Sequence, residues 1–290
     1  MQNETCKLEI VRQPSSHSAW LIPYKIAFGS PPSNQDIQES GITKIVVLSS
    51  PKEVVEYFEN VETVTFAMDE NRPGADEPLF ELAYDISKWV DREEVIYITC
   101  STGRSRSIVL STIVISTILR KDPREALIYV MTCYRARQDY VPYALSQKFI
   151  AQIQRYQRPL RVIFCGDRSS AFIFEEQIEH ELKLLPPHSV VIHGACRGVD
   201  SYVAELAQLR GIPTVAYPAK WDEFGSAAGP IRNREMLKKE RPDKVIAFHP
   251  DIRISHGTKD MVMAAWKEGV PVIIHDRLKK IEFRGDIDDT

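Results

Sequence analysis

The chain has 290 residues and a net charge of -3, with 43% hydrophobic and 27% charged residues. Its 37 lysines and arginines are offset by 40 aspartates and glutamates, so composition gives no electrostatic case for a nucleic-acid partner or a membrane surface. No uncharged stretch is long enough to cross a bilayer, and no basic segment followed by an apolar one opens the chain, so we expect no secretory signal.

The five cysteines, at positions 6, 100, 133, 165 and 196, form neither a CxxC pair nor an even-numbered framework. Reduced thiols in a cytoplasmic protein are the simplest interpretation. The length favours two domains. A polar helix end meets Pro159 and a new apolar strand, so we predict domains at 1–158 and 159–276, followed by a charged, loose tail at 277–290.

Strands come first and helices dominate later in the first predicted domain. Short apolar runs predict strands, and helical spacing or length predicts helices. The strands are expected at 42–50, 62–68 and 94–100, and the helices at 78–90, 107–120, 123–135 and 143–156. This order predicts an α/β domain.

Strands and helices alternate regularly in the second predicted domain. The strands are expected at 160–166, 189–194, 213–219, 244–250 and 270–275, separated by helices at 171–185, 201–211, 230–240 and 258–269. Such alternation predicts a Rossmann-like parallel sheet covered by helices on both faces. A ligand is expected beyond the carboxyl ends of the strands.

A reactive constellation lies between the third predicted strand and the next helix. Cys100 ends the strand and Arg106 opens the helix; the loop between them is Ser101, Thr102, Gly103, Arg104 and Ser105. Gly103 permits a tight turn, and the loop amides with the helix N-terminus are suited to a phosphate. Arg106 would hold two phosphoryl oxygens and favour the thiolate of Cys100. The alternative is a buried cysteine followed by a solvated turn.

A phosphoryl transfer to sulfur also needs an acid for the leaving oxygen. Asp69 ends the strand 62–68, and its rivals Glu70 and Asp76 lie in the same loop. We favour Asp69 because side chains at strand ends are aimed most reproducibly. Any of the three could instead be a solvated loop carboxylate.

The segments "VTFAMDENRP" and "YITCSTGRSRS", with the helical stretch after residue 124, resemble the dual-specificity branch of the cysteine-dependent protein phosphatases over residues 18–157. The resemblance implies a central mixed sheet, and it assigns catalysis to Cys100, Arg106 and Ser107, with Asp69 as general acid. It implies metal-free hydrolysis of phosphate monoesters, without a cofactor, on a phosphorylated protein or small molecule. The family usually has a histidine where this chain has Thr99; that histidine orders the loop and favours the thiolate.

Glycine and arginine turns recur where strands of the second domain end. Several such turns at one sheet edge predict a site for a phosphate-bearing ligand with a sugar or base. The alternative is that the glycines cap helices and the arginines form surface pairs. Neither a Walker A motif nor GxGxxG is present, and His193 and Cys196 alone are too few for a metal. The candidate residues are Gly166, Arg168, Gly194, Arg197, Gly198, Asp200, Gly229, Arg232, Asn233, Gly257 and Thr258.

The segments "CGDRS", "HGACRGVDS" and "HGTKDM" resemble the SLOG superfamily over residues 160–275, and its YspA-type branch most. The resemblance implies a nucleotide or nucleotide-derived ligand. Some members cleave an N-glycosidic bond, but the late glutamate of their signature is replaced here by Met261, next to Asp260, so binding is the expected role.

Two alternatives to a phosphatase stay open: a non-catalytic sensor of a phosphorylated ligand, and a nucleoside-phosphate N-glycosidase in the second domain. We expect no membrane or nucleic-acid partner, and a homo-oligomer is compatible with the sequence.

Overall fold

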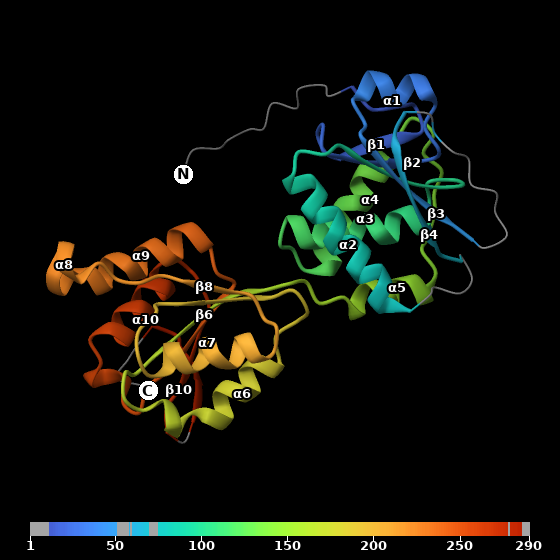
Figure 1. Ribbon diagram of the computed structural model, residues 1–290. Helices are drawn as coiled ribbons and strands as arrows, with labels where there is room; N and C mark the ends of the chain where they lie inside the picture. The colour runs from blue at the N-terminus through green and yellow to red at the C-terminus, as the bar shows by residue number, and fades with distance from the viewer. Residues whose placement is uncertain (1–11, 51–57, 59, 70–74, 278, 286–290) are drawn as a thin grey trace. The chain divides into compact units, whose positions relative to one another are not determined.

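The computed structural model describes residues 12–50, 58, 60–69, 75–277 and 279–285 (Figure 1). The chain divides into two compact units, Met1–Arg158 and Pro159–Thr290. Each unit contains one sheet of mostly parallel strands with helices packed on it. The predicted α/β class is confirmed for both units.

The sheet of the first unit has the order β1-β2-β5-β3-β4, in which β1 is antiparallel to β2 and the other pairs are parallel. The strands are β1 (Ser18–Ile22), β2 (Ile26–Gly29), β3 (Lys44–Ser49), β4 (Glu62–Ala67) and β5 (Ile96–Cys100). The last three agree with the predicted strands. The hairpin β1–β2 was not predicted, because its short strands are buried on both faces and show no alternation.

Helices cover both faces of this sheet. They are α1 (Asn34–Ser40), α2 (Asp76–Asp91), α3 (Arg106–Ile118), α4 (Pro123–Arg135) and α5 (Gln147–Arg155). Helix α3 is buried on nearly all sides and is the central helix, between the sheet and helices α2, α4 and α5. Helix α1, which the sequence analysis also missed, begins with a capping box between Ser33 and Asp36 and packs Ile37 on the opposite face.

The sheet of the second unit has the order β11-β10-β9-β6-β7-β8. The strands are β6 (Arg161–Gly166), β7 (Val190–His193), β8 (Thr214–Ala216), β9 (Lys244–Phe248), β10 (Val272–His275) and β11 (Lys280–Glu282). Strands β6 to β10 are parallel. Because the chain runs outward from β6 to β8 and then restarts at β9 on the other side of β6, the switch point lies between β6 and β9.

Both faces of the second sheet are covered, as predicted (Figure 1). The helices are α6 (Glu175–Lys183), α7 (Val199–Leu209), α8 (Trp221–Phe224), α9 (Ala228–Glu240) and α10 (Gly257–Lys267), with short 3₁₀ turns at Ala171–Ile173, Gly225–Ala227 and Ile252–Ile254. Helices α6 and α7 pack with Phe164 and Phe248 on one face, and α9 and α10 pack with Ile163 and Val245 on the other.

The prediction of a loose tail is wrong for part of 277–290. Lys280–Glu282 forms β11, which pairs antiparallel with the edge strand β10. Phe283 is only 7% exposed, and Ile281 packs against the same core. These two apolar side chains among charged neighbours give the segment a buried face that its charge obscured.

Candidate functional site

The loop that follows β5 lies at the centre of the first sheet, because β5 is flanked by β2 and β3. Cys100 ends the strand and is 1% exposed. Its Sγ is 3.4 Å from the Oγ of Ser107, in the first turn of α3. The structure therefore brings the predicted nucleophile, the serine and a helix N-terminus together.

Arg106 is 1% exposed, and its side chain spans the loop. Its Nη2 donates to the Oγ of Ser101 over 2.8 Å, and its Nη1 donates to the carbonyl of Met68 over 3.4 Å. Asp69, which follows Met68 and is half-buried, is thereby brought to the same guanidinium as the Cys100 loop. Asp69, the predicted acid, thus follows a residue that Arg106 contacts, and Arg106 is the residue predicted to hold the phosphoryl oxygens.

Asp76, the rival candidate for the acid, lies at the start of α2, and its carboxylate is engaged in hydrogen bonds. Its carboxylate accepts hydrogen bonds from Arg155 at 2.5 and 2.9 Å and from Gln152 at 3.1 Å. The hydrogen bonds from Arg155 hold the pKa of Asp76 below its usual value, against the opposing effect of burial. Glu70, the other rival, lies outside the described residues.

Backbone amides of the loop are available to an anion. Within the described part of the chain, the N–H groups of Ser101, Thr102 and Arg104 have no acceptor. Gly103 takes a φ of +61° and its own N–H closes a turn with the carbonyl of Cys100 at 3.3 Å. Such a run of donors before a helix is suited to an oxyanion.

Thr99 directly precedes Cys100, at the position where the resemblance described above leads us to expect a histidine. It is fully buried, and its hydroxyl lies 3.0 Å from the carbonyl of Gly29 and 3.2 Å from that of Cys100. The closer contact ties the end of β5 to the end of β2. A threonine thus provides an ordering contact at this position.

The second unit contains a cavity of about 540 Å³ beyond the carboxyl ends of its strands. It is lined by the segment after β6, by His249 after β9 and by the starts of α9 and α10, which places it at the switch point. Nine of the eleven predicted residues line it: Gly166, Arg168, Gly194, Asp200, Gly229, Arg232, Asn233, Gly257 and Thr258.

The other two predicted residues do not line this cavity. Arg197 is exposed to solvent. Gly198 has a φ of +82° and packs on the turn after β6, since a Cβ there would lie 2.4 Å from the carbonyl oxygen of Asp167. Gly198 therefore shapes the turn and does not face the cavity.

Arg232 is the central cation of the cavity. Its guanidinium lies on Gly194, where a Cβ would fall 1.3 Å from Nη1. Nη1 donates to the carbonyl of Tyr217 at 3.3 Å, and Nη2 lies 3.8 Å from the Sγ of Cys196. Its buried Nε has no hydrogen-bond partner among the described residues. Gly194 is thus required for this arginine to enter the site.

Asp200 is a buried carboxyl in the same cavity. Burial raises its pKa to about 6, although the nearby Arg232 and N–H groups favour the ionised form. It accepts from the N–H of Gly194 at 2.9 Å and of Cys196 at 3.4 Å. Asp200 therefore fixes the turn after β7 through these two hydrogen bonds.

The sequence analysis did not single out Trp221, which also lines the cavity. Its ring centroid lies 5.3 Å from the guanidinium carbon of Arg168. The sequence could have indicated Trp221 as a site residue, because a large aromatic side chain in a polar segment between a strand and a helix often contacts a ligand or a neighbouring cation.

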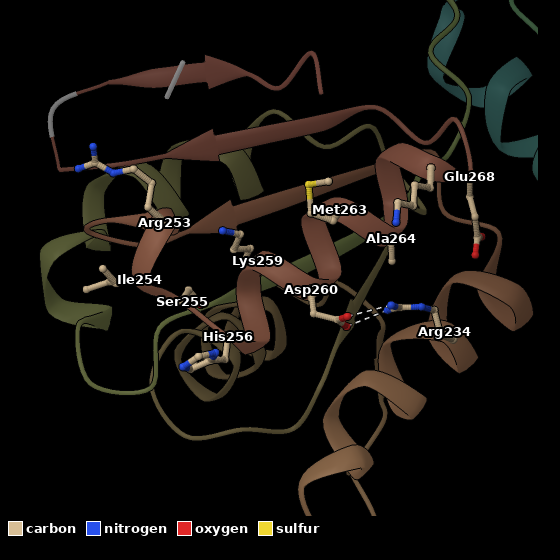
Figure 2. A pocket seen from close by; sticks show the side chains of 11 residues that line it. Arg234, Arg253, Ile254, Ser255, His256, Lys259, Asp260, Met263, Ala264 and Glu268 are labelled. Carbon is tan, nitrogen blue, oxygen red and sulfur yellow. Dashed lines mark hydrogen bonds and ion pairs between the residues drawn. The ribbon is translucent and has the colours of Figure 1, made fainter. Parts of the chain in front are cut away.

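Asp260, the carboxylate next to Met261, does not line this cavity. Met261 lines the cavity, whereas Asp260 lines an adjoining hollow of about 640 Å³ beside α10 (Figure 2). There Asp260 faces Arg234, with contacts of 2.7 and 2.8 Å, and also accepts from Asn233 at 2.8 Å. These hydrogen bonds lower its pKa despite its burial.

Two general absences hold for the described residues. None of their helices is long and apolar enough to cross a membrane. No group of three or more His, Cys, Asp or Glu among them is arranged to hold a metal ion.

The geometry thus gives two candidate sites: a loop with a buried cysteine and a buried arginine on the first sheet, and a cavity lined by arginines at the switch point of the second. Residues 160–224 match the family model YAcAr, the YspA, cpYpsA-related SLOG family. The predicted SLOG resemblance is confirmed over this stretch. No curated protein sequence matches the chain.

Solved structures similar to the N-terminal half include three phosphatase-class proteins. A mouse putative dual-specificity phosphatase, complexed with zinc tungstate, is 17% identical, with 49% of this chain and 86% of that chain covered and a TM-score of 0.40. Human DUSP28 is 17% identical, with 48% and 90% covered and a TM-score of 0.40. The human tyrosine phosphatase-like serine/threonine/tyrosine-interacting protein is 16% identical, with 49% and 96% covered and a TM-score of 0.42.

Proposed function

We propose that the first unit hydrolyses phosphate monoesters through a phosphocysteine on Cys100, in the reducing cytoplasm. The observation that carries the proposal is the loop itself: a strand-end thiol, a buried arginine and backbone N–H groups without acceptors lie within seven residues. This set provides a nucleophile, a charge clamp and an oxyanion cradle. The substrate is a phosphorylated protein or a phosphorylated small molecule.

In the first step the thiolate of Cys100 attacks phosphorus. The S–P bond forms, the P–O ester bond breaks, and Asp69 gives its proton to the leaving oxygen. Arg106 and the amides of Ser101, Thr102 and Arg104 hold the three equatorial oxygens while charge builds on them.

In the second step water attacks the phosphocysteine. The ionised Asp69 accepts a proton from the water, the S–P bond breaks and inorganic phosphate leaves. Ser107, whose hydroxyl is 3.4 Å from Sγ, donates to the departing thiolate. Neither step requires a metal or an organic cofactor.

The test compares Cys100→Ser with Cys133→Ser, since Cys133 is a free thiol on α4 outside the loop. Purified wild-type protein should release phosphate from p-nitrophenyl phosphate, Cys133→Ser should match it, and Cys100→Ser should be inactive. Phosphocysteine should be trapped on the wild type by rapid acid quench. Equal rates in all three proteins would sink the proposal, and phosphate binding without any turnover would identify the protein as a sensor.

For the second unit we propose binding of a nucleotide or a nucleotide-derived ligand. Arg168 and Arg232 supply positive charge on the cavity wall, and Trp221 supplies a ring for a base to stack on. The pairing of Asp260 with Arg234 and the apolar Met261 favour binding over N-glycosidic cleavage.

The matched test uses two arginines of the second unit. Arg232→Met should abolish binding of ADP in isothermal titration, while Arg197→Met, at an exposed position outside the cavity, should leave it unchanged. Inorganic phosphate and adenosine serve as separate probes of the charged and aromatic parts. Equal affinity of both variants for ADP would refute the assignment of this cavity.

A further inference from the structure

An arginine far from the loop in sequence holds one of the loop's carbonyl groups. Arg137 follows the end of α4 and is 4% exposed. Its Nη1 donates to the carbonyl oxygen of Gly103 over 2.6 Å. Nothing in the cysteine–arginine spacing points to this residue, because it lies 34 positions downstream of Gly103.

The guanidinium of Arg137 is itself fixed on its other sides. Nε and Nη2 donate to the two carboxylate oxygens of Asp139 at 2.8 and 2.7 Å. Its carbon lies 5.2 Å from the ring centroid of Tyr134 and 6.0 Å from that of Phe28. A buried arginine with a bidentate carboxylate and two aromatic neighbours has little freedom, so the position of the Gly103 carbonyl is also restricted.

The consequence follows from the planarity of the peptide bond. In a trans peptide the C=O and the following N–H point in opposite directions. Because Arg137 holds the carbonyl of Gly103, the N–H of Arg104 points to the side away from Arg137. That N–H is one of the loop donors that have no acceptor in the described chain.

Two neighbouring contacts restrict the same part of the loop. The Oγ of Ser30 donates to the carbonyl of Thr102 at 3.2 Å. Gly103 packs so closely on the end of β2 that a Cβ would lie 2.2 Å from the carbonyl carbon of Gly29. The loop therefore rests on the Gly29–Ser30 peptide on one side and is held by Arg137 through the next carbonyl.

We propose that Arg137 is a positioning residue of the phosphate loop. It orients the Gly103–Arg104 peptide so that the N–H of Arg104 donates to the bound oxyanion, and it does not touch the substrate. Asp139 keeps Arg137 in the orientation that this requires. The proposal rests on the proposed phosphatase function of Cys100, which it extends by one residue outside the sequence motif.

The experiment compares Arg137→Ala and Arg137→Lys with Arg135→Ala, a matched change at an exposed arginine in the last turn of α4. Two quantities are measured: kcat/KM for p-nitrophenyl phosphate and the Kd of orthovanadate. Arg137→Ala should weaken both by about 100-fold, the loss typical of removing one oxyanion donor. Arg135→Ala should change neither by more than about 2-fold, since surface changes are usually close to neutral.

Chemical rescue distinguishes the positioning role of Arg137 from a purely structural role. Millimolar guanidinium chloride should restore much of the activity of Arg137→Ala and none of that of Cys100→Ser. Arg137→Lys should recover part of the loss, because its ammonium can still donate to the Gly103 carbonyl. If Arg137→Ala does not fold, Arg137→Lys and Asp139→Asn carry the test, and both should show a smaller loss in the same direction.

The outcomes separate this proposal from the phosphatase proposal. Folded Arg137→Ala with wild-type kcat/KM and vanadate affinity would overturn the positioning role, as would a loss that guanidinium does not rescue. If the wild type binds vanadate but turns nothing over, the phosphatase proposal fails, and vanadate affinity alone decides the role of Arg137. If the wild type neither binds vanadate nor turns substrate over, both proposals fail.

Discussion

Arg106 donates a hydrogen bond to the backbone carbonyl of Met68 over 3.4 Å, and the next residue is Asp69. Arg106 therefore contacts both the loop after β5, through Ser101, and the segment that carries the predicted acid Asp69. One guanidinium thus joins two segments that lie far apart in the chain.

Asp69→Asn should remove the proton donor while leaving the loop intact. We expect kcat for an alkyl phosphate to fall by about 100-fold, within the usual range for loss of general acid catalysis. The loss should be much smaller for p-nitrophenyl phosphate, whose leaving group needs little protonation. Steady-state assays on the two substrates check this, and equal losses on both would contradict an acid role.

Asp76→Asn is the control for Asp69→Asn, because it changes the rival carboxylate in the same way. It removes the ionic character of the contact with Arg155 at a partly exposed site, so the free energy of unfolding should fall only slightly. Urea unfolding measures that change. Activity on both phosphates should stay at the wild-type level, and a leaving-group-dependent loss here would transfer the acid role to Asp76.

Gly103→Ala should destabilise the protein by more than the strain of a positive φ alone would cause. Its φ is +61°, and its Cβ would overlap the backbone of Gly29 and Ser30. Gly41 has a similar φ of +66° with nothing within 4 Å of its Cβ position, so Gly41→Ala isolates the backbone strain of about 1 to 2 kcal/mol. Gly103→Ala should exceed that loss in urea unfolding and abolish orthovanadate binding, and equal effects of the two changes would contradict the close packing.

Anion binding in the second unit should depend on the charge of Asp200. Burial raises the pKa of Asp200 to about 6, so the carboxyl is neutral below that pH and negative above it. ADP should therefore bind more weakly as pH rises through about 6. Because the pKa in the folded protein exceeds the usual value of 3.8, the contribution of this group to stability also falls between pH 3.8 and about 6.

Asp200→Asn should flatten the pH dependence of ADP affinity, measured by titration calorimetry between pH 5 and pH 8, that is, over about three units around the range in which the group titrates. Asp222→Asn, on the exposed helix α8, serves as the control and should keep the wild-type profile. An unchanged slope in Asp200→Asn would show that another group controls the affinity.

The stability of the second unit should decline in acid through Glu181. Burial tends to raise the pKa of this carboxyl, but hydrogen bonds from His275 and Lys280 outweigh it and lower the pKa to about 2. The stabilisation is therefore present above the usual pKa of 4.5 and is lost as pH falls toward 2. Glu181→Gln should lower the free energy of unfolding at pH 7 by about 3 kcal/mol.

Denaturant unfolding from pH 7 to pH 3 checks this, that is, across about four units of pH. The Glu181→Gln protein should lose less stability than the wild type below pH 4.5. A parallel decline in both proteins would assign the acid sensitivity to other carboxylates, of which Asp167, with a pKa lowered to about 2 by its hydrogen bonds with Ser170 and Ser169 against burial, is the first candidate.

Local patterns were sufficient for most of the fold. Apolar runs and helical segments predicted the strands β3 to β10, because each pattern depends on residues close together in the chain. The alternation of strands and helices in the second unit predicted a parallel sheet, whereas the order of its strands comes from the structure. The same reasoning failed for β1, β2 and β11. Their short buried faces are defined by the strands they pair with in the folded sheet, β5 for β2 and β10 for β11.

By itself the sequence determined the composition of the two sites: a thiol, a glycine and an arginine within seven residues, and glycine–arginine turns at several strand ends. Only the tertiary structure decided how they are held. Arg137 reaches Gly103, Thr99 reaches Gly29, and Arg168 meets Trp221. These contacts join residues 34 to 70 positions apart, or opposite sides of a cavity, and no local spacing encodes them.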